Sequence, residues 1–226
     1  MSPVRVVLTD IEGTTSAITF VHEVLFPYAR ARLPSWVEAH AHEPRVQAVL
    51  DAMRAEAGTP EAGRDEVVAT LLGWIDADRK ATPLKTLQGW IWEEGYRDGA
   101  YRAHVYADAV EGLRRWHRAG LRLAVYSSGS VHAQQLFFGH SVAGDLQALF
   151  SGWFDTTTGP KRDPSSYAAI AHALAEAPAA ILFLSDVGEE LDAARAAGLR
   201  TTWVVRRGAL PTSSHPVVRT FDGVHP

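Results

Sequence analysis

Four groups of polar residues follow apolar segments of this 226-residue chain, and each group combines side chains that can take part in chemistry. In chain order they contain Asp10 and Glu12 in DIEGTT, Ser127 and Ser128 in SSGS, Lys161, and Asp186 in SDVGEE. Gathered in one place, these carboxylates, hydroxyls and the ammonium group would suit a phosphate ester. A phosphate dianion needs hydrogen-bond donors and positive charge, which Lys161, Ser127 and backbone amides of the turns can supply.

Each carboxylate has a distinct part in such chemistry. Asp10 could attack phosphorus and form an aspartyl-phosphate, provided that Lys161 and a metal ion offset its charge. Mg²⁺ is a hard cation that prefers oxygen ligands, so Asp10 and Asp186 are candidate magnesium ligands. Glu12 could protonate the leaving oxygen and then activate water. Its side chain could also reach the metal, so Glu12 remains a candidate for both roles.

Each of these residues, taken alone, has an ordinary structural explanation. An Asp at a strand end, such as Asp10 or Asp186, often caps a helix or forms a turn. An SSGS stretch is more often a loop, and a single lysine such as Lys161 is more often a solvated surface residue. Their order along the chain, each after a predicted strand, favours a common site over these separate explanations.

Apolar segments predict the sheet that would position these groups. Continuous apolar runs indicate strands covered on both faces; they span residues 4–8, 121–126, 180–184 and 201–205, with a weaker run at 150–153. Helical patterns separate them, among them a helix that begins at Asp163-Pro164 and one at 189–197. This alternation predicts an α/β fold with a doubly wound parallel sheet. Ligands of such sheets bind at the carboxyl ends of the strands, where the polar groups lie.

Residues 18–103 have a different pattern, with helical spacing and no convincing strand. Breaks are expected at Pro27, Pro34, Pro44, residues 58–60 and Pro83. We therefore expect three to five helices that form a cap inserted after the first strand, with a core made of residues 1–17 and 104–226. The final segment, 208–226, contains three prolines and is expected to be irregular.

Composition excludes several other classes of function. Hydrophobic residues make up 46% of the chain, enough for a large core, and the net charge of −4 without a basic stripe argues against a nucleic-acid partner. The absence of cysteine excludes disulfides and thiolate chemistry, and the ten histidines have no zinc-site spacing. Apolar runs of about six residues are too short to cross a membrane. We expect a cytoplasmic monomer.

The motifs, in this order, resemble those of the haloacid dehalogenase-like phosphatases. More narrowly, the chain resembles the enolase-phosphatase branch of methionine salvage. The specific stretches are DIEGTT at 10–15, LQG at 87–89 with Trp92, VYSSGSVHAQQLFFGHS at 125–141 and FDTTTGPK at 154–161. Most phosphatases of the wider group carry Asp where Glu12 stands, and the enolase-phosphatase branch carries Glu there.

This resemblance implies a site and a reaction. It implies that Asp10, Glu12 and Asp186 surround Mg²⁺, with Ser127, Ser128 and Lys161 on the phosphate side. It implies a small-molecule phosphate monoester as substrate, 2,3-diketo-5-methylthiopentyl-1-phosphate, which is enolised and then dephosphorylated to the acireductone 1,2-dihydroxy-3-keto-5-methylthiopentene. Candidates for the cap residues that enolise the ketone and hold the methylthio group are Phe20, Trp92 and Glu93. Among the histidines, which have structural explanations, only His22, near the expected entrance of the cap, is a candidate for a functional role.

Three other functions remain open at this point. The first is a general small-metabolite phosphatase of the same fold, acting on phosphoglycolate or a sugar phosphate. The second is a dehalogenase of this fold, which would need neither Mg²⁺ nor the Asp186 group. The third is a non-catalytic protein that binds phosphorylated metabolites, which the presence of both Asp10 and Lys161 disfavours.

Overall fold

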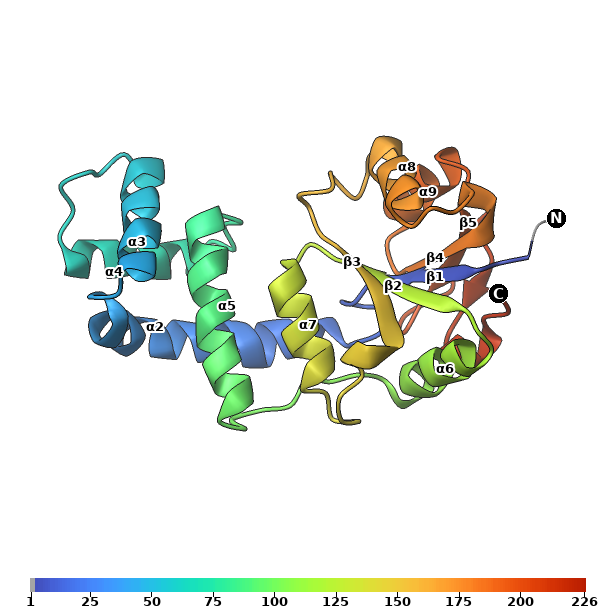
Figure 1. Ribbon diagram of the computed structural model, residues 1–226, viewed down its shortest axis with the longest axis horizontal. Helices are drawn as coiled ribbons and strands as arrows, with labels where there is room; N and C mark the ends of the chain where they lie inside the picture. Colours follow the sequence, from blue (N-terminus) through green and yellow to red (C-terminus); the bar gives the residue numbers. More distant parts are fainter. Residues whose placement is uncertain (1–2) are drawn as a thin grey trace. The chain divides into compact units, whose positions relative to one another are not determined.

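The computed structural model describes residues 3–226, and the chain folds into two compact units (Figure 1). Unit 1 comprises the chain up to Ile18 together with Arg102–Pro226, and unit 2 is Thr19–Tyr101. The helical insert predicted from the sequence spans 18–103. None of the helices within residues 3–226 is both long and apolar enough to span a lipid bilayer.

Unit 1 is built on a parallel sheet whose six strands follow the order β3-β2-β1-β4-β5-β6. The strands are β1 (Val6–Thr9), β2 (Arg122–Tyr126), β3 (Phe150–Phe154), β4 (Ile181–Ser185), β5 (Arg200–Val204) and β6 (Val217–Val218). The four strong strand predictions and the weaker fifth one are confirmed. Strand β6 lies in the segment expected to be irregular. Its two residues pair with Trp203 and Val204 of β5. This pairing is a tertiary contact, and a run of two residues is too short to predict it from sequence.

Helices cover both faces of this sheet, which confirms the doubly wound fold. They are α6 (Ala107–Arg118), α7 (Val131–Gly139), α8 (Pro164–Ala173) and α9 (Gly188–Ala196), with short 3-10 turns η2 (Gln147–Leu149), η3 (Pro178–Ala180) and η4 (Phe221–Gly223). Figure 1 shows α8 and α9 on one side of the sheet and α6 on the other. Buried residues of α8 and α9, such as Ile170 and Leu191, share a core with Leu8 and Phe183 of the strands. The predicted cap of α8 is present, since the Asp163 side chain accepts a hydrogen bond from the Ser165 amide at 2.8 Å.

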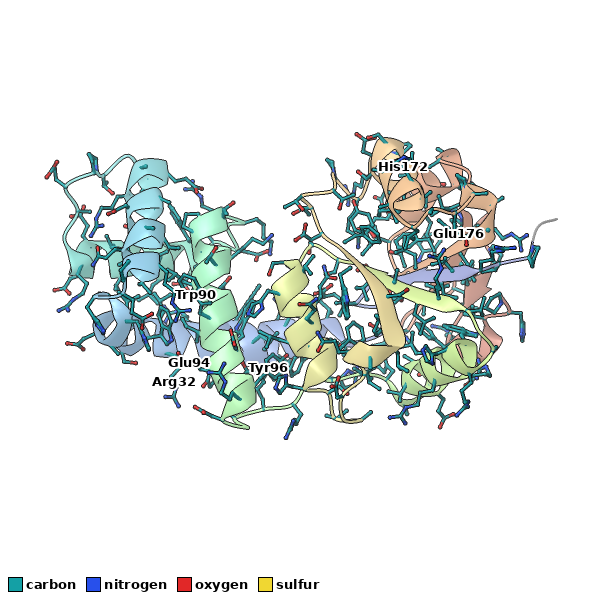
Figure 2. All side chains as sticks on the ribbon, in the orientation of Figure 1. Arg32, Trp90, Glu94, Tyr96, His172 and Glu176 are labelled. Carbon is teal, nitrogen blue, oxygen red and sulfur yellow. The ribbon has the colours of Figure 1, made fainter. Side chains whose placement is uncertain are left out.

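Unit 2 consists of helices, and none of the residues 19–101 lies in a strand. The boundary between the units falls within the short helix α1 (Ile18–Phe20). The further elements of unit 2 are the π-helical turn η1 (Val21–Leu25), α2 (Phe26–His40), α3 (Pro44–Ala57), α4 (Arg64–Asp76) and α5 (Thr82–Arg97). Side chains from α2 to α5, including Leu33, Leu50 and Leu71, form one buried cluster. On α5, Glu94 accepts a hydrogen bond from the Trp36 indole at 2.7 Å, and Figure 2 shows it on the same helix as Trp90.

The predicted helix breaks at Pro27 and Pro34 are wrong. Pro27 lies in the first turn of α2, and Pro34 lies inside this helix, which continues to His40. A proline inside a helix costs about 3 kcal/mol because its ring clashes and its N–H is missing. The neighbouring Leu33 and Val37 are fully buried, and each such side chain contributes about 1.5–3 kcal/mol. Burial of this stretch therefore outweighs the local cost, which the sequence pattern alone does not disclose.

Candidate active site

Three adjacent strands bring the predicted polar groups to one edge of the sheet. Asp10, Ser127 and Asp186 directly follow β1, β2 and β4, respectively. The register pairs Thr9 with both Val125 and Leu184, so the three strands end at nearly the same level. The amide of Asp10 continues this pairing by donating to the Leu184 carbonyl at 2.9 Å. The geometry thus places these three residues together in unit 1.

Lys161 is held between two carboxylates. Its Nζ lies 2.8 Å from Oδ1 of Asp10 and 2.7 Å from Oε2 of Glu190, and the side chain is only 10% exposed. Burial alone would lower the pKa of Lys161, but the charges and hydrogen bonds of Asp10 and Glu190 outweigh it, so the pKa is raised above its ordinary value. Lys161 is therefore a buried ammonium group and not a solvated surface residue.

The loop that carries Lys161 is fixed by hydroxyl groups beneath it. The Tyr167 hydroxyl donates to the carbonyl oxygen of Lys161 at 2.7 Å, and the Tyr126 hydroxyl donates to that of Gly159 at 2.8 Å. Ser166 Oγ donates to the Pro160 carbonyl at 2.8 Å. These bonds anchor the stretch between β3 and α8, so the ammonium group is positioned before any substrate binds.

The loop after β1 folds tightly around the Ile11 carbonyl. That oxygen accepts from the amides of Thr14, Thr15 and Ser16 at 2.9–3.2 Å, while the Ile11 amide donates to Asp10 Oδ1 at 2.8 Å. The side chain of Asp10 is thereby oriented by its own loop, and it is 5% exposed. Such a preformed arrangement suits a nucleophile that must meet a reacting atom in a fixed direction.

Gly13 lets this loop approach Asp186. Its φ of +76° is disfavoured for other residues, and a Cβ atom there would lie 2.0 Å from Asp186 Oδ2. Asp186 does not cap the following helix, because the N-cap of α9 is Val187 and no side chain caps it. Its carbonyl oxygen accepts from the Trp203 indole at 2.9 Å. The Asp186 carboxylate therefore lies against Gly13 of the loop that follows β1.

Glu12 and Ser127 form a pair across the site. Ser127 Oγ donates to Glu12 Oε2 at 3.1 Å and accepts from the Gly129 amide at the same distance. Burial raises the pKa of Glu12, and the charge of Asp10 raises it further. Ser128, the next predicted residue, has an exposed side chain.

The carboxylates carry more negative charge than Lys161 can offset. Burial, and then the charge of Asp10, raises the pKa of Asp186 from 3.8 to about 7, and the same causes raise the pKa of Glu190. Within residues 3–226, no three carboxylate or imidazole side chains are already arranged as a complete metal site. The donor set nevertheless fits Mg²⁺, because Asp10 and Asp186 offer hard oxygen atoms whose mutual repulsion a divalent cation would relieve.

Two buried acids were not among the predicted site residues. Glu190 pairs with Lys161 and accepts from Ser185 Oγ at 3.0 Å. Asp155 accepts from the amides of Val131 and Thr157, at 3.1 and 2.9 Å. Asp155 lies in the specific stretch FDTTTGPK and Glu190 in the acidic motif SDVGEE, so their position in those motifs was the available signal. Their burial and their partners depend on the tertiary structure.

The residues predicted to act from the insert lie in unit 2, in contact with its own side chains. Trp92 donates from its indole to the Leu25 carbonyl at 2.9 Å, and Glu93 pairs with Arg97 at 2.7 Å. The ring of Phe20 meets that of Tyr101 edge-on at 6.3 Å, and His22 meets Phe26 edge-on at 5.6 Å.

The chain is similar to known proteins over almost its whole length. The profile of the family described as haloacid dehalogenase-like hydrolase matches residues 4–198. A protein of Azotobacter vinelandii named enolase-phosphatase E1 is 58% identical over 224 residues, which cover 99% of this chain and 98% of the relative. A protein of the same name from Methylococcus capsulatus is 56% identical over 223 residues, with the same two coverages.

Solved structures are similar in fold as well. The UTR4 protein of Saccharomyces cerevisiae superposes with a TM-score of 0.84 at 34% sequence identity, and the match covers 98% of this chain and 100% of that one. The L-2-haloacid dehalogenase of Xanthobacter autotrophicus superposes with a TM-score of 0.58 at 18% identity, covering 96% and 95% of the two chains. The second similarity concerns the fold alone.

Proposed function

The chain belongs to the haloacid dehalogenase-like hydrolases and, among them, to the enolase-phosphatases, and on this premise we propose how its residues act. The enzyme is a phosphoric monoester hydrolase. Its proposed substrate is 2,3-diketo-5-methylthiopentyl-1-phosphate, which it enolises and dephosphorylates to the acireductone of methionine salvage. The proposed reaction passes through an aspartyl-phosphate at Asp10.

The observation that carries this proposal is the buried ammonium group of Lys161 against Asp10. A carboxylate that attacks a phosphate ester brings two negative groups together, so a fixed cation at the nucleophile lowers the barrier. Lys161 lies 2.8 Å from Asp10, and its raised pKa keeps it charged at neutral pH. As the new Asp10–phosphorus bond forms, the bond from phosphorus to the leaving oxygen breaks.

Glu12 is the proposed proton donor and acceptor. Its raised pKa favours the protonated carboxylic acid, which can give its proton to the leaving oxygen in the first step. The resulting carboxylate can then take a proton from the water that attacks the phosphorus of the aspartyl-phosphate, which frees Asp10 and inorganic phosphate. Ser127 holds Glu12 for both transfers through its hydrogen bond to Oε2.

Mg²⁺ is the proposed cofactor, with Asp10 and Asp186 as its protein ligands. When bound, it would supply positive charge beside the phosphoryl oxygens. Glu12 is assigned primarily to proton transfer, since Ser127 already engages its carboxylate. Lys161 and the amides of the Ser127–Gly129 turn are the proposed phosphate contacts, with Ser128 beside them.

The direct test of the substrate is a turnover panel. The diketo phosphate should give phosphate together with an enediol product that absorbs in the ultraviolet, at a kcat/KM far above that for phosphoglycolate or sugar phosphates. The Asp10→Asn variant should release no phosphate. A wild-type enzyme that hydrolyses simple esters well and does not turn over the diketone would instead be a general small-metabolite phosphatase.

A further inference from the structure

Arg206 is a buried cation that contacts the loop that follows Asp10. It follows β5, and its side chain is 8% exposed. Its Nε donates to the carbonyl oxygen of Thr14 at 2.8 Å, and its Nη1 donates to Oδ2 of Asp108 at 2.6 Å. The guanidinium carbon also lies 4.2 Å from the centre of the Tyr106 ring. No part of the proposed chemistry uses this side chain.

We propose that Arg206 is a positioning residue that holds the loop of Asp10 and Glu12 in its reactive geometry. The loop can transmit such a restraint because it is closed on itself. Gly13 donates from its amide to the Ser16 carbonyl at 2.8 Å, and Glu12 and Ser16 form an isolated bridge. A shift of the Thr14 carbonyl therefore moves the backbone of Glu12.

The same loop is connected to Asp10. Thr15 Oγ1 donates to the carbonyl oxygen of Asp10 at 3.2 Å, and the carbonyl oxygen of Thr15 accepts from the Tyr106 amide at 3.0 Å. Tyr106 also packs under the guanidinium group of Arg206. Arg206 and Tyr106 thus donate hydrogen bonds to the carbonyl groups of two consecutive loop residues, Thr14 and Thr15.

The guanidinium group of Arg206 is itself held by residues of α6 and η4. Oδ2 of Asp108, on α6, accepts from both Arg206 and the backbone amide of Phe221, the latter at 2.8 Å. The Phe221 ring lies 5.1 Å from the guanidinium carbon. Arg206 Nη2 is buried and has no hydrogen-bond partner among the described residues. The contacts to Thr14 and Asp108 therefore fix the guanidinium group in an orientation that leaves Nη2 without a hydrogen bond.

An arginine is suited to this position and a lysine is not an equivalent. The planar guanidinium group presents donors in two fixed directions and stacks on an aromatic ring at the same time. One ammonium group could reach either Thr14 or Asp108 but could not reproduce the stacking on Tyr106. The expected rank of activity is therefore wild type, then Arg206→Lys, then Arg206→Ala.

The test measures positioning separately from folding, and it rests on the proposed function of Asp10. Arg206→Ala should lower kcat by about 10- to 100-fold, because a small displacement from a distant change can cost about 10²-fold. KM should stay within about twofold. Inhibition by vanadate, which mimics the pentacoordinate phosphorus, should weaken in parallel with kcat, while inhibition by inorganic phosphate stays unchanged. Added ethylguanidinium should restore part of kcat.

Arg219→Ala is the matched control. Arg219 lies in the same C-terminal segment, and its side chain donates to the carbonyl groups of Val205 and Gly208. Its own carbonyl oxygen, which accepts from Arg206 Nη1 at 3.4 Å, is retained in the Ala variant. This variant should keep the wild-type kcat and vanadate inhibition. If Arg206→Ala does not fold, Arg206→Lys and Asp108→Asn provide the same comparison, with smaller losses expected.

A folded Arg206→Ala or Arg206→Lys enzyme with wild-type kcat and vanadate inhibition would overturn the inference. So would a loss of kcat that follows only the fraction of folded protein and that ethylguanidinium does not reverse. A wild-type activity that survives in Asp10→Asn would overturn the proposed function, and with it this inference. The two failures are therefore distinguishable.

Discussion

Nζ of Lys161 lies 2.8 Å from Oδ1 of Asp10, and both side chains are almost fully buried. The same nitrogen is 2.7 Å from Oε2 of Glu190, so one cation serves two carboxylates. One cation does not balance the acids of the site, since burial and the charge of Asp10 raise the pKa values of Asp186 and Glu190 despite the presence of Lys161. The predictions below follow from this balance.

Removal of the cation should affect both rate and stability. Lys161→Ala should lower kcat by about 10²–10³, the usual loss for a preorganised electrostatic group, whereas Lys161→Arg should keep partial activity. Without metal, the Ala variant should also lose about 3–5 kcal/mol of unfolding free energy, because two buried carboxylates lose their partner. Phosphate release and urea unfolding measure the two effects. A near-normal kcat for Lys161→Ala would remove the electrostatic role.

Gly13→Ala should weaken magnesium binding through Asp186. The new Cβ would lie 2.0 Å from Asp186 Oδ2, so the carboxylate must move. Gly58→Ala is the matched control, because Gly58 has a similar φ of +71° and open space around its Cβ position. Calorimetric titration with Mg²⁺ should give a weaker Kd for Gly13→Ala alone, while both variants lose about 1 kcal/mol of stability from the disfavoured backbone. Equal Kd values would mean that Asp186 is not a ligand.

The unfolding free energy should fall as pH rises, because the pKa of Asp186 is raised in the folded protein. Its pKa is about 7 in the folded protein without metal and 3.8 ordinarily, so between these values the folded state keeps a proton that the unfolded state has lost. The unfolding free energy must therefore fall as pH rises through this window. Glu12 and Glu190, whose pKa values are also raised, act in the same direction.

Magnesium binds the ionised carboxylate, so its stabilising effect should grow over the same pH range. Thermal unfolding in EDTA and in excess Mg²⁺, from about pH 5 to pH 8, measures the difference. Asp186→Asn should flatten part of the pH dependence and remove most of the magnesium effect. A stabilisation by Mg²⁺ that is independent of pH, or that persists in Asp186→Asn, would speak against this ligand.

Glu12→Gln should separate the two chemical steps. Gln cannot donate or accept the proton that Glu12 transfers, so kcat should fall by about 10²–10⁴. For esters with an acidic leaving alcohol, formation of the aspartyl-phosphate should slow less, because such an alcohol leaves without protonation. Breakdown of the aspartyl-phosphate should stay slow for every ester, so a burst of alcohol should precede steady turnover. Rapid-quench kinetics with a p-nitrophenyl ester detects that burst. An equal effect on all esters without a burst would assign Glu12 to metal binding instead.

The sequence predicts the sheet well because buried parallel strands appear as continuous apolar runs. It also predicts the place of the site, because ligands bind at the carboxyl ends of parallel strands and polar residues follow Tyr126 and Leu184 there. It does not disclose β6 or the continuity of α2 through Pro34, since both depend on tertiary contacts that compensate for weak local signals.

The same distinction holds within the site. Asp10 and Lys161 could be identified by their order and motif. Glu190, the second partner of Lys161, could not, because this ion pair depends on how α9 packs beside the loop before α8. Arg206 gave no local signal at all. Arg206 and Thr14 are 192 residues apart in the sequence, and they come into contact only in the folded chain.

The most direct test of the central claim is to trap the phosphorylated Asp10. Glu12→Gln enzyme is mixed with a stoichiometric amount of substrate, quenched in acid and reduced with borohydride, which converts an aspartyl-phosphate into homoserine. Peptide mass spectrometry should then find homoserine at position 10, dependent on substrate and absent in Lys161→Ala at the same reaction time. Unmodified Asp10 in an enzyme that has released its leaving alcohol would contradict covalent catalysis and would indicate direct attack by water.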